Sequence, residues 1–155
     1  MHTRCLWLLV VFLLPTGGIA PSFHPPPGFH VMGSHLVVKR GFASWYGHAH
    51  QGKATASGEP FDMHAFTAAT WGIKMGSFVH VKNLKNGAVV TVRINDRGPG
   101  AQHVPKRHHA AGVPSVRVID VSYRAAQDLG MVADGLVPVE VYFCEAMKTP
   151  QRVVK

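Results

Sequence analysis

Asp96 stands where an apolar strand pattern stops and a turn begins. Residues 89–94 alternate in polarity as a half-buried strand does, and residues 95–99, Asn-Asp-Arg-Gly-Pro, are dense in turn formers. The strand would fix the carboxylate and the loop would give a substrate access to it, so Asp96 is placed to act as a general acid or base. In the other interpretation, Asp96 only forms the turn and Arg97 balances its charge.

A second carboxylate, Glu59, lies in a loop of small residues. Residues 53–58 read Lys-Ala-Thr-Ala-Ser-Gly, and Pro60 stiffens the position after Glu59. Small side chains let the backbone approach a ligand closely. Glu59, followed by Asp62, therefore suits binding or proton transfer at a polymer. An ordinary solvated turn fits the same residues.

Three further residues near these loops could contact a ligand or hold the fold together. Alternation along a strand puts one of Trp45 and Tyr46 inward, and we expect Tyr46 to be the exposed one that can stack on a sugar ring. Asp120 precedes a helix start, and we interpret it as a structural residue that ties the helix to the rest of the fold, although a place near the site is compatible with its position.

Alternating segments predict the strands that must position these residues, and they are residues 41–47, 75–83, 89–94, 116–121 and 137–143. Asn86-Gly87 predicts a tight hairpin before residues 89–94. Residues 65–71 form either a short strand or a turn packed on the core. Ser122 as N-cap and Gly130 as terminator predict a short helix between them. Short strands with a single helix predict an all-β fold, a small closed β-barrel.

The 155 residues suffice for one such domain. Residues 1–20 have the basic start, short apolar core and small terminal residues of a secretory signal with cleavage after Ala20, and a retained anchor is the alternative. Residues 21–40 are rich in Pro and Gly and predict a linker. The domain is then expected over residues 41–145, with a tail over residues 146–155.

The cysteines and the charge bear on compartment and partners. Cys5 precedes the apolar core, so it is not the lipidated cysteine of a lipoprotein, and the mature chain keeps only Cys144, which we expect to be partly buried. Sixteen Lys and Arg against eight Asp and Glu give a net charge of +8. Outside the cytoplasm such charge suits acidic wall polymers, whereas nucleic acid is not expected as a partner of a secreted protein. The charge could also serve only solubility.

Eight short blocks, in this order, give the chain a resemblance to the rare lipoprotein A (RlpA) family; they are residues 41–47, 52–59, 61–63, 67–69, 81–84, 86–87, 92–99 and 117–122. The resemblance implies a six-stranded double-psi β-barrel, a fold shared with expansins and barwin-like proteins. It also implies a lytic transglycosylase that acts on peptidoglycan, with a preference for glycan strands stripped of stem peptides.

In that reaction the C6 hydroxyl of N-acetylmuramic acid attacks its own anomeric carbon and leaves a 1,6-anhydro end. The family pattern places Asp96 and Glu59 in the site with Asp62 close by. Our hypothesis is that Asp96 is the acid/base and that Glu59 positions it or stabilises charge, although the roles could be exchanged. Arg97 would point away or bind substrate. No cofactor is expected, and the protein is expected to be a monomer in the periplasm or at the cell wall, without a membrane span after processing.

The chain departs from the family pattern at one residue and in the length of one connection. Thr70 stands where the family has an active-site histidine, and threonine does not exchange protons near neutral pH. Either His64, His48 or His50 takes over from a neighbouring loop, or catalysis is weakened or lost. The alternative function is therefore a non-lytic, expansin-like module that binds peptidoglycan. A barwin-like inhibitor is less favoured, because such domains are usually stapled by disulfides.

The second departure is a longer, basic connection after Pro99. Residues 101–116 carry His103, His108 and His109, and we expect this loop to border the cleft because it follows Asp96 so closely. A metal site is not favoured, because adjacent histidines rarely share a metal and no carboxylate or thiolate nearby completes a ligand set. A mobile solvated loop is the other interpretation.

Overall fold

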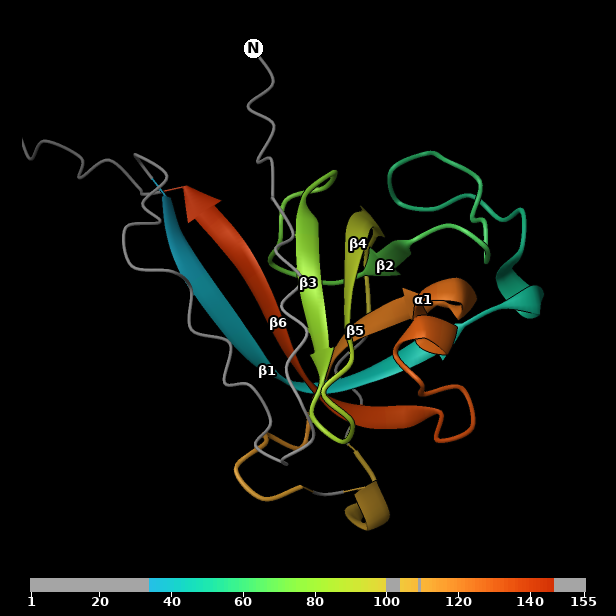
Figure 1. Cartoon of the computed structure of the whole chain (residues 1–155). Coiled ribbons are helices and arrows are strands. Elements are labelled where there is room, and N and C mark those ends of the chain that lie inside the picture. Colours follow the sequence, from blue (N-terminus) through green and yellow to red (C-terminus); the bar gives the residue numbers. More distant parts are fainter. Residues whose placement is uncertain (1–33, 100–103, 109, 147–155) are drawn as a thin grey trace, which may run out of the picture.

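Six strands close into one β-barrel in the computed structural model, which describes residues 34–99, 104–108 and 110–146 (Figure 1). The strands are β1 (Ser34–Tyr46), β2 (Thr67–Ala69), β3 (Phe78–Asn83), β4 (Val89–Asp96), β5 (Arg117–Ser122) and β6 (Leu136–Ala146). The α-helix α1 (Tyr123–Asp128) and two short 3-10 turns, η1 (His48–His50) and η2 (Lys106–His108), lie between them.

The order of strands around the barrel is β1-β5-β2-β4-β3-β6. β1 runs parallel to β5, and β2 runs parallel to β4, while the other neighbouring pairs are antiparallel. Parallel neighbours need crossover connections, so strands that are distant in sequence come to lie side by side. The predicted all-β barrel with one short helix is confirmed.

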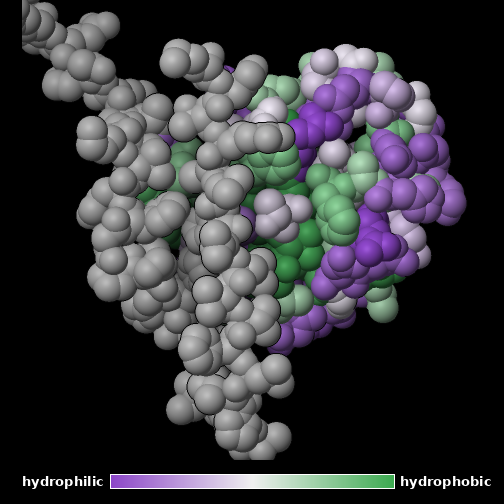
Figure 2. All heavy atoms as spheres, turned by 45° about the horizontal axis from the view of Figure 1, so that its top comes forward, coloured by the Kyte–Doolittle hydropathy of each residue, from purple (hydrophilic) through white to green (hydrophobic). Residues whose placement is uncertain are grey.

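Alternation along the strands fills the barrel with aliphatic side chains. On β3 and β4, buried and exposed residues alternate, and Val79, Val81, Val92 and Ile94 are fully buried. The helix α1 adds Ala125 and Ala126 to the same core. Figure 2 shows the surface of the molecule coloured by hydropathy. Polar residues gather along the right-hand rim in this view, and apolar residues lie towards the centre.

Local turn and cap chemistry agrees with the sequence prediction. Gly87 has φ +78° in the connection between the antiparallel strands β3 and β4, a conformation that glycine adopts without steric cost. The side chain of Ser122 accepts a hydrogen bond from the Ala125 N–H as the N-cap of α1, and Gly130 with φ +64° follows the end of the helix.

The strands at the two ends of the domain are longer than predicted. β1 begins at Ser34, within the predicted linker of residues 21–40, and its ladder with β6 runs from Ser34↔Ala146 to Ser44↔Leu136. Pairing with β6 provides hydrogen-bond partners for the backbone N–H and C=O groups of residues 34–40, which the sequence pattern had assigned to a linker. Cys144 is exposed near the end of β6 rather than partly buried. The predicted signal segment and most of the tail lie outside the described residues.

Within the part of the chain that the structure describes, no helix is long and apolar enough to cross a membrane.

Candidate active site

One small residue, Ala69, lies between two carboxylates. In the register of β2, Ala69 is the partner of Asp96 on β4 and also of Asp120 on β5. Because neighbouring strands are about 4.8 Å apart, the two aspartates are separated by about 10 Å of backbone across β2. Ala69 itself contributes only a methyl group to this part of the barrel.

A cavity of about 340 Å³ lies over this point. The strands β1, β2, β4 and β5 and the loop of residues 50–61 supply its walls, which are Ser44, Trp45, Tyr46, His50, Lys53, Ala54, Thr55, Phe61, Ala69, Asp96, Arg97, Arg117 and Asp120. The cavity thus combines two carboxylates with several basic groups and two aromatic residues of β1. Such a concave site with few convergent polar groups is typical of ligand binding.

The carboxylate of Asp96 is anchored on one side only. Its Oδ1 accepts hydrogen bonds from the backbone N–H groups of Ala56 and Arg97, each at 2.8 Å. The loop that provides Ala56 is also fixed to β4 by the Ser57 N–H, which donates to the Asn95 carbonyl at 3.0 Å. Oδ2 has no hydrogen-bond partner among the described residues and is left for a ligand.

Asp120 is held by more side chains than Asp96, and its own side chain is largely buried. Its carboxylate accepts from the Ser44 hydroxyl and pairs with Arg117, whose Nε lies 3.1 Å from Oδ1 and whose Nη2 lies 3.2 Å from Oδ2. Burial raises the pKa of Asp120 above its ordinary value, and Ser44 and Arg117 oppose that rise. Asp120 therefore links β5 to β1 and faces the cavity, which corrects our interpretation that it ties α1 to the barrel.

Tyr46 lines the cavity together with Trp45, and both are half-buried, so Tyr46 is not the exposed one of the two as we had expected. The ring stacks on Phe61 with centroids 4.3 Å apart, and its edge meets His50 at 5.7 Å. Its hydroxyl is buried without a hydrogen-bond partner among the described residues. Burial, and then the charges of Asp96 and Asp120, raise the pKa of Tyr46, so the hydroxyl stays protonated and can donate to a ligand.

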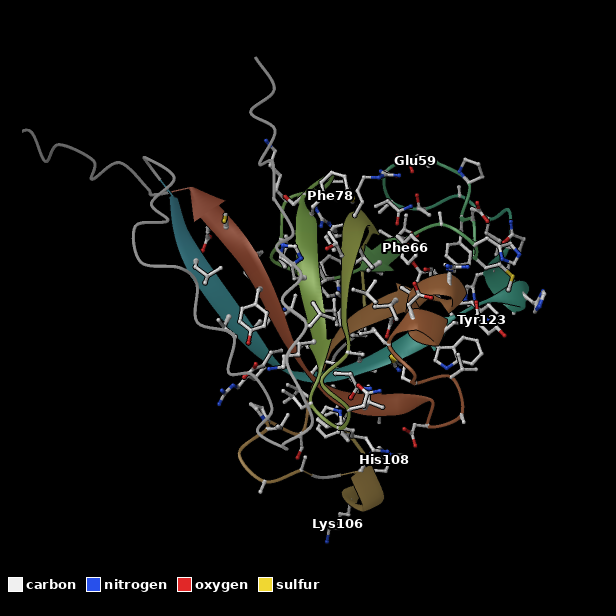
Figure 3. The ribbon with its side chains drawn as sticks, in the orientation of Figure 1. Glu59, Phe66, Phe78, Lys106, His108 and Tyr123 are labelled. Atoms are coloured by element: carbon white, nitrogen blue, oxygen red, sulfur yellow. The ribbon has the colours of Figure 1, made fainter. Side chains whose placement is uncertain are left out.

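Glu59 does not line the cavity with Asp96. Both of its carboxylate oxygens accept from the Arg93 guanidinium at 2.7 Å, and the Asn95 amide lies 3.5 Å away. The hydrogen bonds from Arg93 lower the pKa of Glu59. Figure 3 shows Glu59 in the loop that projects beyond the end of β4. The expected convergence of the two side chains on one cavity thus differs from the observed placement, because Arg93 holds Glu59 on the outer side of this loop.

The remaining predicted site residues have separate places. Thr70 is buried, and its hydroxyl donates to the Val118 carbonyl at 2.8 Å, so it does not face the cavity. Asp62 is exposed and accepts from the His64 N–H at 2.9 Å in a surface turn, with His64 exposed beside it. Arg97 does line the cavity, while its Nη1 donates to the Ile73 carbonyl at 2.9 Å.

Of the three histidines considered as substitutes for the family histidine, His50 lines the cavity. The described part of the basic loop, residues 104–108 and 110–116, contributes nothing to the cavity walls and lies at the opposite end of the barrel from the loop that carries Glu59 (Figure 1). The expectation that this part borders the cleft is wrong.

Among the described residues, no group of His, Cys, Asp and Glu could hold a metal ion.

Ser44, Lys53 and Arg117 also line the cavity, although their positions in the sequence did not lead us to expect it, and Asp120 has a different role from the one expected. A polar residue within an apolar strand was the available signal, since Asp120 interrupts Val-Ile-Asp-Val and Ser44 follows a buried alanine. Such a residue must be paired or must face a cavity. Only the parallel pairing of β1 with β5 shows that these two are partners, in the register Ser44↔Asp120.

Comparison with known structures agrees with the fold. The Streptomyces papain inhibitor is similar over 70% of this chain and 94% of its own, with a TM-score of 0.50 and 20% sequence identity. The barrel is a double-psi β-barrel, as the resemblance implied.

Comparison with known sequences identifies the family. The lytic transglycolase family model matches residues 38–141, so the chain belongs to this family. The chain is 45% identical over 101 residues to the probable endolytic peptidoglycan transglycosylase RlpA of Aquifex aeolicus, and 46% identical over 104 residues to the endolytic peptidoglycan transglycosylase RlpA of Neisseria meningitidis. These matches cover 65% and 67% of this chain but only 39% and 38% of the two relatives.

The burial of Asp120 predicts a pH-dependent difference in stability between the wild type and Asp120→Asn. A carboxyl whose pKa is raised by folding costs stability once it ionises, so the wild type should lose stability relative to the variant as pH rises above 3.8, the ordinary pKa of the group. Urea unfolding at pH values between about 4 and 7 measures the free energy of unfolding of both proteins.

The matched control for this prediction is Asp134→Asn, because that carboxylate is 41% exposed and pairs with Lys85 at the surface, where solvent screens the interaction. A difference between wild type and Asp120→Asn that stays constant over this pH range would contradict the prediction.

Proposed function

We propose that this domain is a lytic transglycosylase that cleaves the bond between N-acetylmuramic acid and N-acetylglucosamine in peptidoglycan. The C6 hydroxyl of the muramic acid unit attacks its own anomeric carbon, the bond to the leaving oxygen breaks, and a 1,6-anhydro end forms. One carboxyl group of the protein, the acid/base, gives its proton to the oxygen that leaves with N-acetylglucosamine. The resulting carboxylate then receives the proton of the C6 hydroxyl. Family membership and the names of the relatives support this activity.

The observation that carries the proposal is the pair of aspartates on either side of Ala69. Asp96 is the acid/base, because its Oδ1 is fixed by two backbone N–H groups and its Oδ2 is left for the substrate. Asp120, buried and held by Ser44 and Arg117, stabilises positive charge at the anomeric carbon. No cofactor takes part in these steps.

The charge of the cavity suits an acidic glycan. Its walls contain Lys53, whose side chain makes no hydrogen bond or ion pair among the described residues, together with Arg97 and Arg117. A muramic acid unit without its stem peptide carries a free lactyl carboxylate, which an unpaired ammonium group attracts. This supports strands stripped of stem peptides as the substrate. Such a substrate requires a location outside the cytoplasm, in the periplasm or at the cell wall, consistent with a signal over residues 1–20.

Glu59 acts by positioning in this proposal. Its pairing with Arg93 fixes the loop whose Ala56 N–H holds Asp96. His50 takes the place of the histidine that Thr70 replaces, because it lies in the cavity wall, whereas Thr70 is directed towards Val118. Asp62 and His64, in the exposed turn, remain proposed only as outer contacts of a long substrate.

A domain that binds glycan strands without cutting them is the second function we consider. The observation in its favour is that position 70 holds no titratable group and its hydroxyl is bound to the Val118 carbonyl. The two functions share a substrate and differ in the product.

Asp96→Asn is expected to abolish the formation of 1,6-anhydro ends. The variant keeps an oxygen that accepts from Ala56 and Arg97 but cannot transfer a proton, so the rate should fall by at least about 100-fold. The assay incubates amidase-stripped glycan strands with the protein and detects 1,6-anhydro ends by mass spectrometry. Asp128→Asn, a surface carboxylate paired with Arg124, is the control and should remain active. Wild type that sediments with strands but releases no anhydro product would establish the non-cutting function.

The pair Glu59–Arg93 allows a charge-swap test of positioning against direct chemistry. Glu59→Gln should lower activity by about tenfold, less than Asp96→Asn, because only the loop anchor is weakened. The double variant Glu59→Arg with Arg93→Glu restores the ion pair with reversed polarity and should recover most activity. A loss with Glu59→Gln as severe as with Asp96→Asn, without recovery in the double variant, would assign the chemistry to Glu59.

His50→Phe should lower kcat by at least about tenfold, because it keeps a ring against Tyr46 but removes the polar nitrogen atoms from the cavity. The matched control is His48→Phe, an exposed histidine of the same 3-10 turn outside the cavity walls. Equal kcat values in the two variants would show that His50 does not replace the family histidine.

A further inference from the structure

The cavity alone is short for a polymer. At about 340 Å³ it lies at the lower end of the range for small-molecule pockets, about 300 to 1,000 Å³, and it leaves most of a glycan strand outside. A strand must therefore lie on the surface next to the cavity, and this surface needs a group that holds a neighbouring sugar unit.

Trp71 is not part of the cavity wall, but it belongs to the segment that leaves the wall at the end of β2. Ala69 lines the cavity, and Trp71 follows two residues later, in the connection to β3. The cavity residue Arg97 donates from Nη1 to the carbonyls on either side of Trp71, to Thr70 at 3.4 Å and to Ile73 at 2.9 Å. The same guanidinium that borders the cavity thus fixes the backbone that presents the indole.

The backbone of Trp71 is fixed from a second side as well. Lys39 of β1 donates from Nζ to the Trp71 carbonyl at 3.2 Å. Despite these anchors, the residue is 55% exposed. Because its side chain remains largely in solvent, Trp71 contributes little to the stability of the fold through burial. Because its backbone is already fixed, the residue needs little reorganisation to bind a ligand.

The other aromatic residues near the cavity are engaged in the fold. Tyr46 stacks on Phe61, and the indole of Trp45 donates to the Val132 carbonyl at 3.3 Å and packs on Tyr123 at 5.3 Å. The indole of Trp71, by contrast, makes no hydrogen bond or ring contact with another described residue, and Trp71 is 55% exposed.

We infer that Trp71 binds the sugar unit that follows the reacting unit of the glycan strand, by stacking its indole on the C–H face of the pyranose ring. This inference rests on the proposed function and adds to it a second binding position outside the cavity. A pyranose presents C–H groups on its faces and hydroxyls around its edge, so an aromatic face binds it while the hydroxyls remain in water. Trp71 touches no reacting atom and acts through binding alone.

The test measures binding in the Asp96→Asn background, so that strands stay intact. Amidase-stripped glycan oligomers of defined length are titrated into Asp96→Asn and into the same protein with Trp71→Ala or Trp71→Phe. Loss of the stacked ring should weaken the Kd of the Ala variant by about five- to tenfold, and the Phe variant should stay within about twofold. The effect should vanish for a disaccharide that fills only the cavity.

Two further readouts separate binding from a general structural effect. In the active protein, Trp71→Ala should raise KM and leave kcat unchanged, since uniform binding is lost. Tryptophan fluorescence of Asp96→Asn should change on addition of oligomers, and this change should be smaller with Trp71→Phe, in which Trp45 of the cavity wall still responds to the ligand. The control is Phe78→Ala, which removes an aromatic ring that is 67% exposed on β3, a strand that contributes no cavity wall (Figure 3).

The outcomes distinguish this inference from the proposed function. Wild-type cutting with equal Kd and KM for Trp71→Ala would overturn the role of Trp71 and leave the proposed function standing. Equal weakening by Trp71→Ala and Phe78→Ala would also overturn it, because the contact would then be unspecific. Strands that neither bind nor yield anhydro ends with wild type would overturn the proposed function and this inference together.

Discussion

The arrangement of the site depends on the pairing of a three-residue strand, β2, with β4 on one side and β5 on the other. This double pairing gives Ala69 two register partners, Asp96 and Asp120. Since interstrand spacing is fixed by backbone hydrogen bonds, the distance between the two carboxylates is set by the sheet and does not depend on flexible loops. Closure of the barrel also requires the parallel pairing of β1 with β5, which brings Ser44 to Asp120.

Backbone and side-chain contacts then give the two aspartates different environments. Asp96 ends β4 and meets backbone N–H groups at the edge of a loop, so one of its oxygens stays available. Asp120 lies within β5, where burial raises its pKa and Ser44 and Arg117 occupy its carboxylate. Unequal environments are what allow two identical side chains to take different parts in one reaction.

The loop of residues 50–61 connects the barrel to its substrate-facing surface. It supplies cavity walls from Lys53 to Phe61, and it is fixed to β4 by the ion pair of Glu59 with Arg93 and by the hydrogen bond from Ser57 to Asn95. Arg97, directly after β4, fixes the segment that contains Trp71. Charged side chains on β4 or directly after it thus fix both the loop of residues 50–61 and the segment after β2, and the aliphatic core of the barrel provides its stability.

Sequence alone determined the features that depend on neighbours in the chain. Alternating polarity gave β3 and β4, Asn86-Gly87 gave their hairpin, Ser122 gave the start of α1, and short motifs gave the family and the place of Asp96. Tertiary structure decided which distant residues meet. It placed Asp120 in the cavity, turned Thr70 towards Val118 and held Glu59 outside through Arg93. The physical reason is that turns and caps are satisfied by hydrogen bonds over a few residues, whereas strand pairing in a closed barrel is set by the packing and closure of the whole chain.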